Sequence, residues 1–189
     1  SEILDAANHS TRFEYDARGN QIKQIDALGN TVTRVYDDAN QLLTETIYLT
    51  PDPDGQGSQQ ASDARTTRYV YDAEKHLRFV ISDSGEVVEH RYNDDGQNIK
   101  SLVYGQGNYD VSGLTQQQSP SEAELVACVN AISDFSQVQL SEKSYDAAGQ
   151  LKSLKQFSAT STAGIGAGTV SETRYFYDRH GQLIRTLDS

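Results

Sequence analysis

The sequence predicts a mainly β fold, an array of antiparallel β-hairpins that form a continuous curved, spiralling sheet with one short inserted α-helix. Three observations predict it. A Tyr-Asp pair, once Tyr-Asn, occurs six times; the residues before each pair alternate as in a strand; and a glycine follows most of the pairs at a fixed distance. All 189 residues are expected to belong to one array.

The spacing of the pairs indicates one repeat unit. Tyr15 to Tyr36 and Tyr71 to Tyr92 are both 21 residues apart, and the remaining gaps of 35, 53 and 32 residues exceed 21 by 14, 32 and 11. Insertions are therefore predicted at about 50–64, 104–135 and 157–169. The six pairs are Tyr15-Asp16, Tyr36-Asp37, Tyr71-Asp72, Tyr92-Asn93, Tyr145-Asp146 and Tyr177-Asp178.

The segment before each pair is expected to be a strand. Residues 11–15, 67–71 and 173–177 read TRFEY, TRYVY and TRYFY. Thr, Tyr and Phe at every second position form one stripe on one face of a sheet. Tyrosine suits this place, because its ring can pack while its hydroxyl stays near water. The repeat tyrosines are therefore predicted to form a recurring packing stripe.

A tight turn is expected after each tyrosine. The Asp or Asn side chain can accept a hydrogen bond from the N–H two residues on. Glycine at the fourth position supplies the positive φ that closes a type I turn with a G1 bulge. Asn40 and Lys75 take the place of that glycine in two repeats. The residues predicted to build the repeats are Tyr15, Asp16, Gly19, Tyr36, Asp37, Asn40, Tyr71, Asp72, Tyr92, Asn93, Gly96, Tyr145, Asp146, Gly149, Tyr177, Asp178 and Gly181.

The return strands are expected to begin at one offset in four repeats, at Leu42, Leu77, Leu151 and Leu183. Ile22 and Ile99 come one residue later, which predicts an extra residue in those two turns. A lone hairpin is marginal in water, so neighbouring hairpins must support one another. The lack of methionine and the equivalent phase of both termini predict a piece of a longer array.

The first and last insertions are predicted to be loops. Residues 50–64 are rich in Pro, Gly, Asp and Gln, which favours a solvated hairpin tip. Asp52 and Asp54 could meet calcium, but the spacing of an EF-hand loop is absent. Residues 157–169 are mostly small, and Gly164–Gly168 only weakly resembles a phosphate-binding loop because the Lys-Ser/Thr ending is missing.

The middle insertion predicts the helix. Residues 104–118 are rich in Gly and Gln, and Ser119–Glu122 then reads as a capping box with proline at the first helical position. A helix over about 120–132 would place Leu125, Val126, Val129 and Ile132 on one face, against the sheet. Cys128, the single cysteine, is expected near the buried side and can form no disulfide within the chain.

Composition and the remaining polar residues argue against several functions. The net charge of −11 disfavours nucleic acid and anionic lipid, and no apolar run approaches the length of a membrane span. The histidines, at 9, 76, 90 and 180, have no partners at metal-ligand spacing. No catalytic residue, cofactor or metal is predicted, and the chain is not expected to be an enzyme.

The pattern Tyr-Asp-x-x-Gly-x-Leu, followed by Asp-x-x-Gly, resembles the Rhs/YD-repeat family. Its members include bacterial Rhs polymorphic toxins, the B and C components of insecticidal toxin complexes, and teneurins. The resemblance covers six units from about Ile3 to Asp188, with Lys75 and Asn93 departing from the consensus. It implies a secreted or cell-surface bacterial protein whose hairpins spiral into a hollow shell around a C-terminal toxin.

The resemblance also raises a self-cleaving activity, since family shells often end in an aspartic-protease-like segment with an Asp-Pro-x-Gly motif. Residues 52–55 match that motif superficially, but they lie in an early insertion with no large apolar residue after them. This activity is therefore not assigned to the chain.

Three functions are weighed. The first is a structural segment of a toxin shell, with the rest of the shell and the enclosed toxin as partners. The second, which the resemblance also implies, is a carbohydrate-binding or adhesive module that uses exposed Tyr, Asn and Gln on the sheet and in residues 104–118. The third is a hydrolase with a composite site. Open sheet edges also predict self-association.

Overall fold

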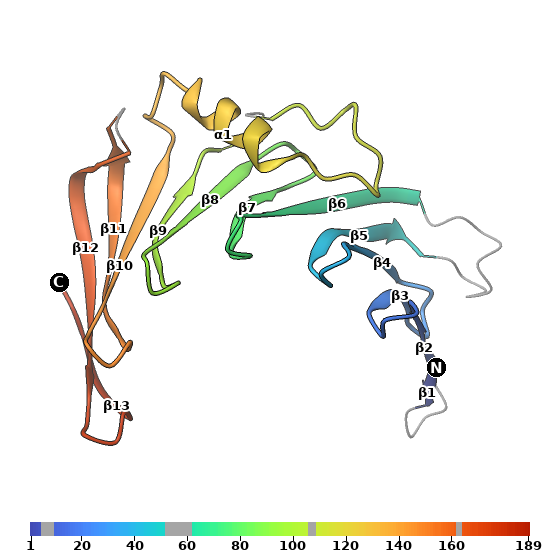
Figure 1. Cartoon of the computed structure of the whole chain (residues 1–189), viewed down its shortest axis with the longest axis horizontal. Coiled ribbons are helices and arrows are strands. Elements are labelled where there is room, and N and C mark those ends of the chain that lie inside the picture. Colours follow the sequence, from blue (N-terminus) through green and yellow to red (C-terminus); the bar gives the residue numbers. More distant parts are fainter. Residues whose placement is uncertain (5–9, 52–61, 106–108, 162–163) are drawn as a thin grey trace. The chain divides into compact units, whose positions relative to one another are not determined.

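A computed structural model describes residues 1–4, 10–51, 62–105, 109–161 and 164–189 (Figure 1). Within these residues it contains thirteen β-strands and one α-helix. The chain divides into two compact units. In both units the strands are antiparallel and follow one another in the order of the sequence. The mainly β, antiparallel fold with one short helix is confirmed, whereas the single array over 1–189 and its spiral curvature remain predictions.

The first unit comprises Ser1–Val70, Ile81–Asp83 and Val111–Pro120. Each strand pairs antiparallel with the one before it. Consecutive hairpins thus share strands, which gives each hairpin the support that it lacks alone. The strands are β1 (Glu2–Leu4), β2 (Ser10–Tyr15), β3 (Gln21–Ile25), β4 (Thr31–Tyr36), β5 (Leu42–Thr50) and β6 (Ser62–Tyr71).

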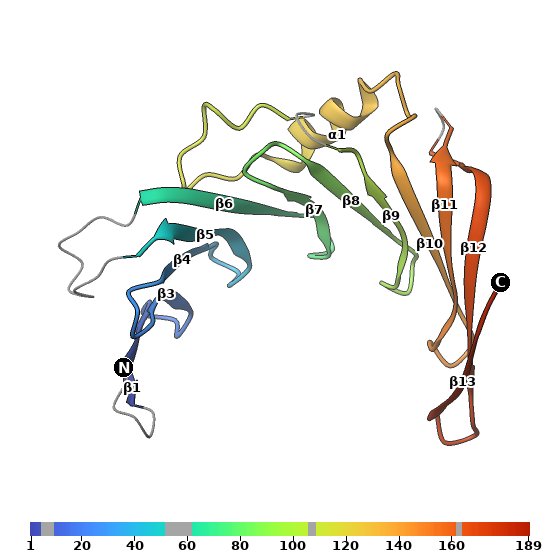
Figure 2. The ribbon, with the colours of Figure 1, turned by 180° about the vertical axis from the view of Figure 1, so that it is seen from behind.

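The second unit comprises Tyr71–Val80, Ser84–Asp110 and Ser121–Ser189. From β8 onward each strand is paired antiparallel with the next. Figure 2, the reverse view, again shows β10, β11 and β12 running side by side. The elements are β7 (Leu77–Ile81), β8 (Val87–Tyr92), β9 (Asn98–Val103), α1 (Glu122–Asn130), β10 (Gln139–Tyr145), β11 (Leu151–Thr160), β12 (Gly166–Tyr177) and β13 (Leu183–Asp188).

The helix α1 is present, but its cap differs from the prediction. The N-cap is Ser121, whose Oγ accepts from the N–H of Glu124 at 3.3 Å while the Glu124 carboxylate accepts from the N–H of Ser121 at 2.8 Å. The predicted box at Ser119–Glu122 was wrong because the Ser119 hydroxyl instead donates to the Tyr69 carbonyl at 3.0 Å. Among the described residues, no helix is long and apolar enough to cross a membrane.

The loop predicted at 157–169 was wrong over most of its length. β11 continues to Thr160 and β12 starts at Gly166, so the insertion lengthens both arms of a hairpin. The glycines allow the two strands to pack closely and do not form a phosphate-binding loop. A Cβ at Gly166, for example, would lie 2.2 Å from the Phe157 ring. In the same way, residues 50 and 62–64 of the first insertion lie in strands. Asp52 and Asp54, and the motif at 52–55, lie outside the described residues.

The turns after Tyr15, Tyr36, Tyr92, Tyr145 and Tyr177 have the same length, so the prediction of an extra turn residue before Ile22 and Ile99 was wrong. Tyr15 pairs with Gln21, six residues on, and Tyr36 pairs with Leu42. The register then slips by one residue, and Ile22 is the residue left without a partner. The same slip follows Tyr92, Tyr145 and Tyr177. The extra residue is therefore a β-bulge in each return strand, and the turn itself does not change.

Two positions of the repeat build the core between hairpins, except after the fifth repeat tyrosine, where Lys155 faces Glu172. The residue ten after the repeat tyrosine faces the residue five before the next one, as in Ile25 with Thr31 and Leu102 with Leu140. Thr46 and Thr66 form the same kind of pair, and their hydroxyls lie 2.9 Å apart. All six side chains are at most 6% exposed. Cross-strand pairs of this kind are the unit that stabilises a sheet.

Part of the middle insertion is bound to the first unit. The buried guanidinium of Arg68 donates to the carbonyls of Gln118 at 3.0 Å and Thr115 at 3.3 Å. The Tyr48 hydroxyl donates to the side chain of Gln116 at 2.8 Å. Residues 115–118 thus run along one face of β5 and β6 and satisfy polar groups that the strands leave there.

Candidate functional site

The repeat corner is the turn from each repeat tyrosine to the sixth residue after it. In the first corner one carboxylate oxygen of Asp16 accepts from the N–H groups of Arg18 and Asn20, both at 2.9 Å. The N–H of Gly19 donates to the Asp16 carbonyl at 3.2 Å. Hydrogen bonds from Asn20, its side-chain amide first, lower the pKa of Asp16. The equivalent side-chain bonds form at Asp37, Asn93, Asp146 and Asp178, and in part at Asp72.

The fourth residue after the repeat tyrosine has a left-handed backbone in every repeat. The glycines at 19, 96, 149 and 181 have φ between 74° and 90°. Asn40 and Lys75 adopt the same conformation, with φ of 62° and 71°. Lys75 therefore keeps the corner geometry but carries a side chain that this conformation disfavours.

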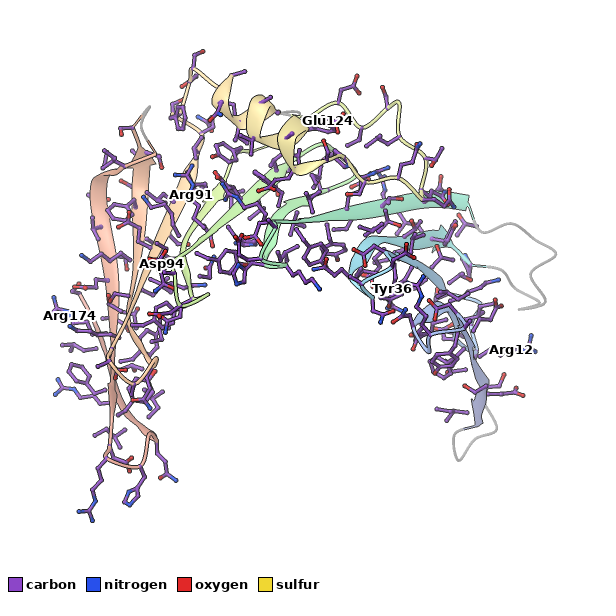
Figure 3. The ribbon with its side chains drawn as sticks, in the orientation of Figure 1. Arg12, Tyr36, Arg91, Asp94, Glu124 and Arg174 are labelled. Atoms are coloured by element: carbon purple, nitrogen blue, oxygen red, sulfur yellow. The ribbon has the colours of Figure 1, made fainter. Side chains whose placement is uncertain are left out.

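Four of the repeat tyrosines reach the corner before their own. The Tyr36 hydroxyl, labelled in Figure 3, donates to the Gln21 carbonyl at 3.3 Å. The acceptor is always the sixth residue after the preceding repeat tyrosine. This bond, the tyrosine link, recurs from Tyr92 to Leu77 (2.8 Å), from Tyr145 to Asn98 (2.9 Å) and from Tyr177 to Leu151 (3.0 Å). Tyr15 is 49% exposed.

A charged cluster is buried in the second unit. The Glu89 side chain is 1% exposed, and it accepts from Arg78 at 2.6 Å and from Arg91 at 2.9 and 3.0 Å. The Tyr104 hydroxyl also donates to Glu89. Arg78 lies 3.9 Å from Glu122 at the start of α1. The cluster therefore joins β7, β8, the segment after β9 and the helix.

The cluster keeps Glu89 ionised. Burial opposes the ionised form, but hydrogen bonds from Arg91 and Tyr104 and the charges of Arg78 and Arg91 outweigh it, so the pKa of Glu89 is lowered. Burial and the neighbouring carboxylate raise the pKa of Tyr104, which stays a hydrogen-bond donor. Buried charges of this kind are costly unless every partner is present.

The side chains of His76 and His90 make structural contacts within the fold. His90 Nδ1 lies 2.9 Å from Ser101 Oγ, and that hydroxyl donates to Asn98 at 3.2 Å. Because the serine proton is directed to Asn98, the imidazole is not placed to remove it. Burial, and then the charge of Lys143, lower the pKa of His90. His76 stacks on Tyr92 with ring centroids 4.6 Å apart.

No metal-binding group was found among the described residues, where no three His, Cys, Asp or Glu side chains are grouped closely enough to hold an ion. His9, Asp52 and Asp54 lie outside that part of the chain. Cys128 is half-buried, and burial raises the pKa of its thiol. A raised thiol pKa leaves little thiolate at neutral pH, which disfavours a reactive role.

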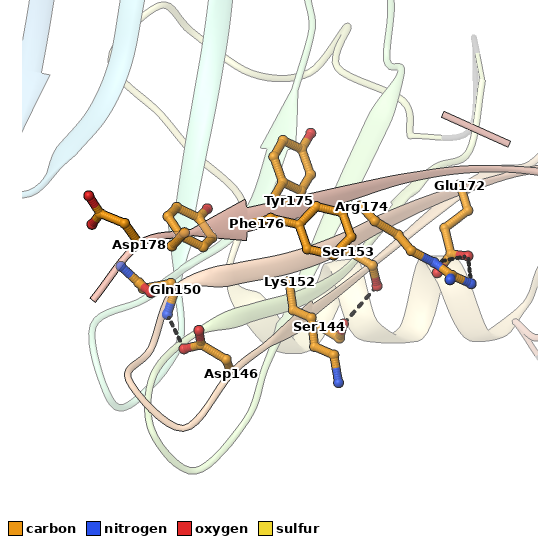
Figure 4. Close-up of a pocket in the computed structure, with 11 residues that line it drawn as sticks. Ser144, Asp146, Gln150, Lys152, Ser153, Glu172, Arg174, Tyr175, Phe176 and Asp178 are labelled. Atoms are coloured by element: carbon orange, nitrogen blue, oxygen red, sulfur yellow. Dashed lines mark hydrogen bonds and ion pairs between the residues drawn. The ribbon is translucent and has the colours of Figure 1, made fainter. Parts of the chain in front are cut away.

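A groove of about 790 Å³ lies over β10, β11 and β12 (Figure 4). The ring of Phe176 lies near Arg174, which donates to Glu172 at 2.7 and 2.9 Å. Aromatic faces beside paired charges can bind a polar ligand. The lining residues are Ser144, Asp146, Gln150, Lys152, Ser153, Glu172, Arg174, Tyr175, Phe176, Tyr177 and Asp178.

Sequence reasoning placed the corners but missed the tyrosine link and the Glu89 cluster. The alternation of β8 contained a signal for the cluster, because Val87, Glu89 and Arg91 fall on one face of a strand whose first residue is apolar. A carboxylate on that face needs a partner. The acceptors of the tyrosine link gave no such signal, since they are main-chain carbonyls of Gln, Leu or Asn.

Comparisons with known proteins agree with the corner geometry. Residues 15–56 match the model of the RHS Repeat family. No curated protein matches the chain. A crystal structure of TcdB2-TccC3 without its hypervariable C-terminal region matches 95% of the chain with a TM-score of 0.53 and 14% identity. One of TcdB2-TccC3-Cdc42 matches 96% of it with a TM-score of 0.45 and 18% identity.

The chain covers only 8% and 9% of those two solved chains. The likeness to the first shows a shared fold, and the matched repeat includes the corners of Tyr15 and Tyr36. Residues 15–56 therefore match an RHS Repeat, and over the rest of the chain the likeness is one of fold.

Proposed function

We propose that the chain is a wall segment of a toxin-complex shell that encloses or presents a toxin domain. The tyrosine link carries this proposal, because it joins four of the corners to the corner before them and so favours a continuous sheet of hairpins. The fold shared with TcdB2-TccC3 supports it. The partners are the rest of the shell and the toxin, and the assembly is secreted or lies at the cell surface.

The proposed role is structural and not enzymatic. The carboxylates of the corners are used in turn hydrogen bonds, as Asp16 is. The buried carboxylate of Glu89 is occupied by two guanidiniums and a phenol. His90 accepts no proton from its serine neighbour. These groups support the fold, which is what a shell wall requires.

The test is electron cryomicroscopy of the longest protein that contains this chain, combined with limited proteolysis. We expect the repeats to line a closed cavity, and the polypeptide inside to resist protease until the shell is denatured. Replacing both Tyr145 and Tyr177 with Phe should weaken protection, whereas Tyr15→Phe serves as a matched control. Repeats that form a solid or extended body, with no enclosed polypeptide, would refute the proposal.

A second candidate is carbohydrate binding in the groove over β10–β12. The observation that favours it is the ring of Phe176 beside the Glu172–Arg174 ion pair. A glycan array followed by calorimetry tests it. Phe176→Ala should abolish any sugar binding and Ile165→Ala, at an exposed side chain outside the groove, should retain it. Binding that Phe176→Ala leaves unchanged, or no binding at all, would reject this candidate.

A further inference from the structure

His90 belongs to a chain of hydrogen bonds where the β8–β9 hairpin meets β10. Its Nδ1 lies 2.9 Å from Ser101 Oγ, and that hydroxyl donates to Asn98 Oδ1 at 3.2 Å. Both partners lie on β9 and carry no charge. The ammonium of Lys143, on β10, donates to the same Asn98 oxygen at 2.9 Å. These four side chains, the His90 cluster, therefore join three strands.

The strand pairing that the cluster supports is short. β9 and β10 pair over residues 100–103 and 139–142, which is four residues in each strand, whereas six pairs join β10 to β11. We call the shorter pairing the β9–β10 seam. Because a short ladder has few main-chain hydrogen bonds, the side-chain bonds across it contribute a larger share of its stability.

The charges around His90 oppose a second proton on its ring. Lys143 from β10 and Arg78 from β7 are positive, and Arg78 donates to the His90 carbonyl at 2.5 Å. In the described part of the chain, the carboxylate that acts on the ring is Glu89, whose oxygens already accept from Arg78 and Arg91. Burial and the two positive charges therefore lower the pKa of His90.

The equivalent position of an earlier hairpin shows how the fold accommodates a cation there. Arg34, like His90, lies two residues before a repeat tyrosine, and it faces Glu45 as His90 faces Ser101. The Arg34 guanidinium lies 2.7 Å from the Glu45 carboxylate. A serine can accept a hydrogen bond but cannot neutralise a charge. An imidazolium at His90 would therefore be a second cation beside Lys143, without a facing carboxylate.

We infer that the His90 cluster is an acid-sensitive joint, which holds β8, β9 and β10 together while the imidazole is neutral and loosens the β9–β10 seam when the imidazole is protonated. Because the folded chain favours the neutral ring, the contribution of the cluster is complete above the ordinary pKa of 6.5 and is lost as the pH falls below it. This inference goes beyond the proposed shell function, since it concerns a property of the chain alone.

Hydrogen exchange of the chain at about pH 7.5 and about pH 5.5 tests the inference. Protection factors, which correct for the effect of pH on exchange itself, report how readily each strand opens. In the β9–β10 seam they should fall by up to about tenfold for each pH unit, the limit that one proton sets. β4 and β5, where Arg34 pairs with Glu45, are the internal reference and should change by less than about twofold.

Two variants remove the titrating group. His90→Gln keeps a side chain that can form hydrogen bonds, and His90→Tyr introduces the residue that Tyr69 and Tyr175 supply at the same position of other repeats. In both variants the protection of the seam should be the same at the two pH values, whatever its absolute level. His180→Gln is the matched control, at a side chain that is 68% exposed, and should keep the native pH dependence.

A third variant, Ser101→Glu, places a carboxylate opposite His90 as Glu45 lies opposite Arg34. It should reverse the effect, so that the seam is better protected at the lower pH. Equal protection of the native seam at both pH values would overturn the inference. The same loss in His90→Gln as in the native chain, or an equal loss in β4 and β5, would also overturn it. None of these results depends on whether the chain lines a shell.

Discussion

The buried charge of Glu89 makes a strong prediction about stability. The substitution Glu89→Gln keeps the shape of the side chain and removes its charge. It leaves Arg78, whose side chain is 20% exposed, without the carboxylate that it contacts at 2.6 Å. It also replaces a charged acceptor of the Tyr104 hydroxyl with a neutral one. Both changes act in the folded state alone.

The expected loss follows from burial. Removing one partner of a buried ion pair costs about 3–5 kcal/mol. The Arg91 side chain is 42% exposed, so water can hydrate it after the change, which favours the lower end. We therefore expect the free energy of unfolding to fall by roughly 3 kcal/mol. Glu142→Gln is the matched control, because Glu142 holds the same position in β10 but its side chain is 35% exposed.

Urea denaturation followed by circular dichroism at pH 7 measures both variants. With a slope of about 2 kcal/mol/M, Glu89→Gln should lower the midpoint by roughly 1.5 M. Glu142→Gln should lower it by less than about 0.5 M, as is usual for a half-exposed pair. Equal shifts in the two variants would refute the argument that burial decides the cost.

The same variant tests the pH dependence. Because the folded state lowers the pKa of Glu89 below the ordinary 4.5, the carboxylate contributes its full stability above that pH. The contribution is lost as the pH falls through the folded pKa. The difference between the native chain and Glu89→Gln should therefore be largest at pH 7 and shrink below pH 4.5. A difference that stays constant with pH would contradict the assignment of the charge.

Three further predictions concern the corners, each measured as a change in the urea midpoint. Tyr145→Phe, which removes the tyrosine link to Asn98, should cost about 1 kcal/mol, while Tyr15→Phe should cost close to nothing. Lys75→Gly should stabilise the chain by about 1 kcal/mol, because its φ of 71° disfavours a side chain. Gly149→Ala should destabilise the chain by about 1 kcal/mol, because its φ of 79° disfavours a side chain. A steric clash does not add to this cost, since the new Cβ would meet only Gln97, at an ordinary 3.4 Å. Changes of the opposite sign would contradict each one.

The corners could be predicted because their chemistry is local. An Asp side chain reaches the N–H groups two and four residues on whatever the rest of the chain does, as at Asp16. The left-handed residue three positions later follows from the same local geometry. Lys75 shows the limit of this reasoning, because the surrounding corner holds a lysine in a conformation that its own preference opposes.

The contacts between hairpins could not be predicted in the same way. The bulge at Ile22 depends on the register between two strands. Counting residues along the chain instead assigns the extra residue to the turn. The pairing of Leu102 with Leu140 spans an insertion that contains α1. The Glu89 cluster depends on which strands become neighbours. Each of these features is determined by which strands pair in the folded chain, and the sequence pattern predicts that pairing only weakly.

The tyrosine link has a consequence for how such chains can evolve. Its acceptor is a main-chain carbonyl, and the residues that supply it are as different as Gln21, Leu77 and Asn98. A unit that is duplicated, lost or exchanged needs no compensating side chain in its new neighbour to re-form this bond. Recombination can thus change the number of hairpins while this bond re-forms between the new neighbours.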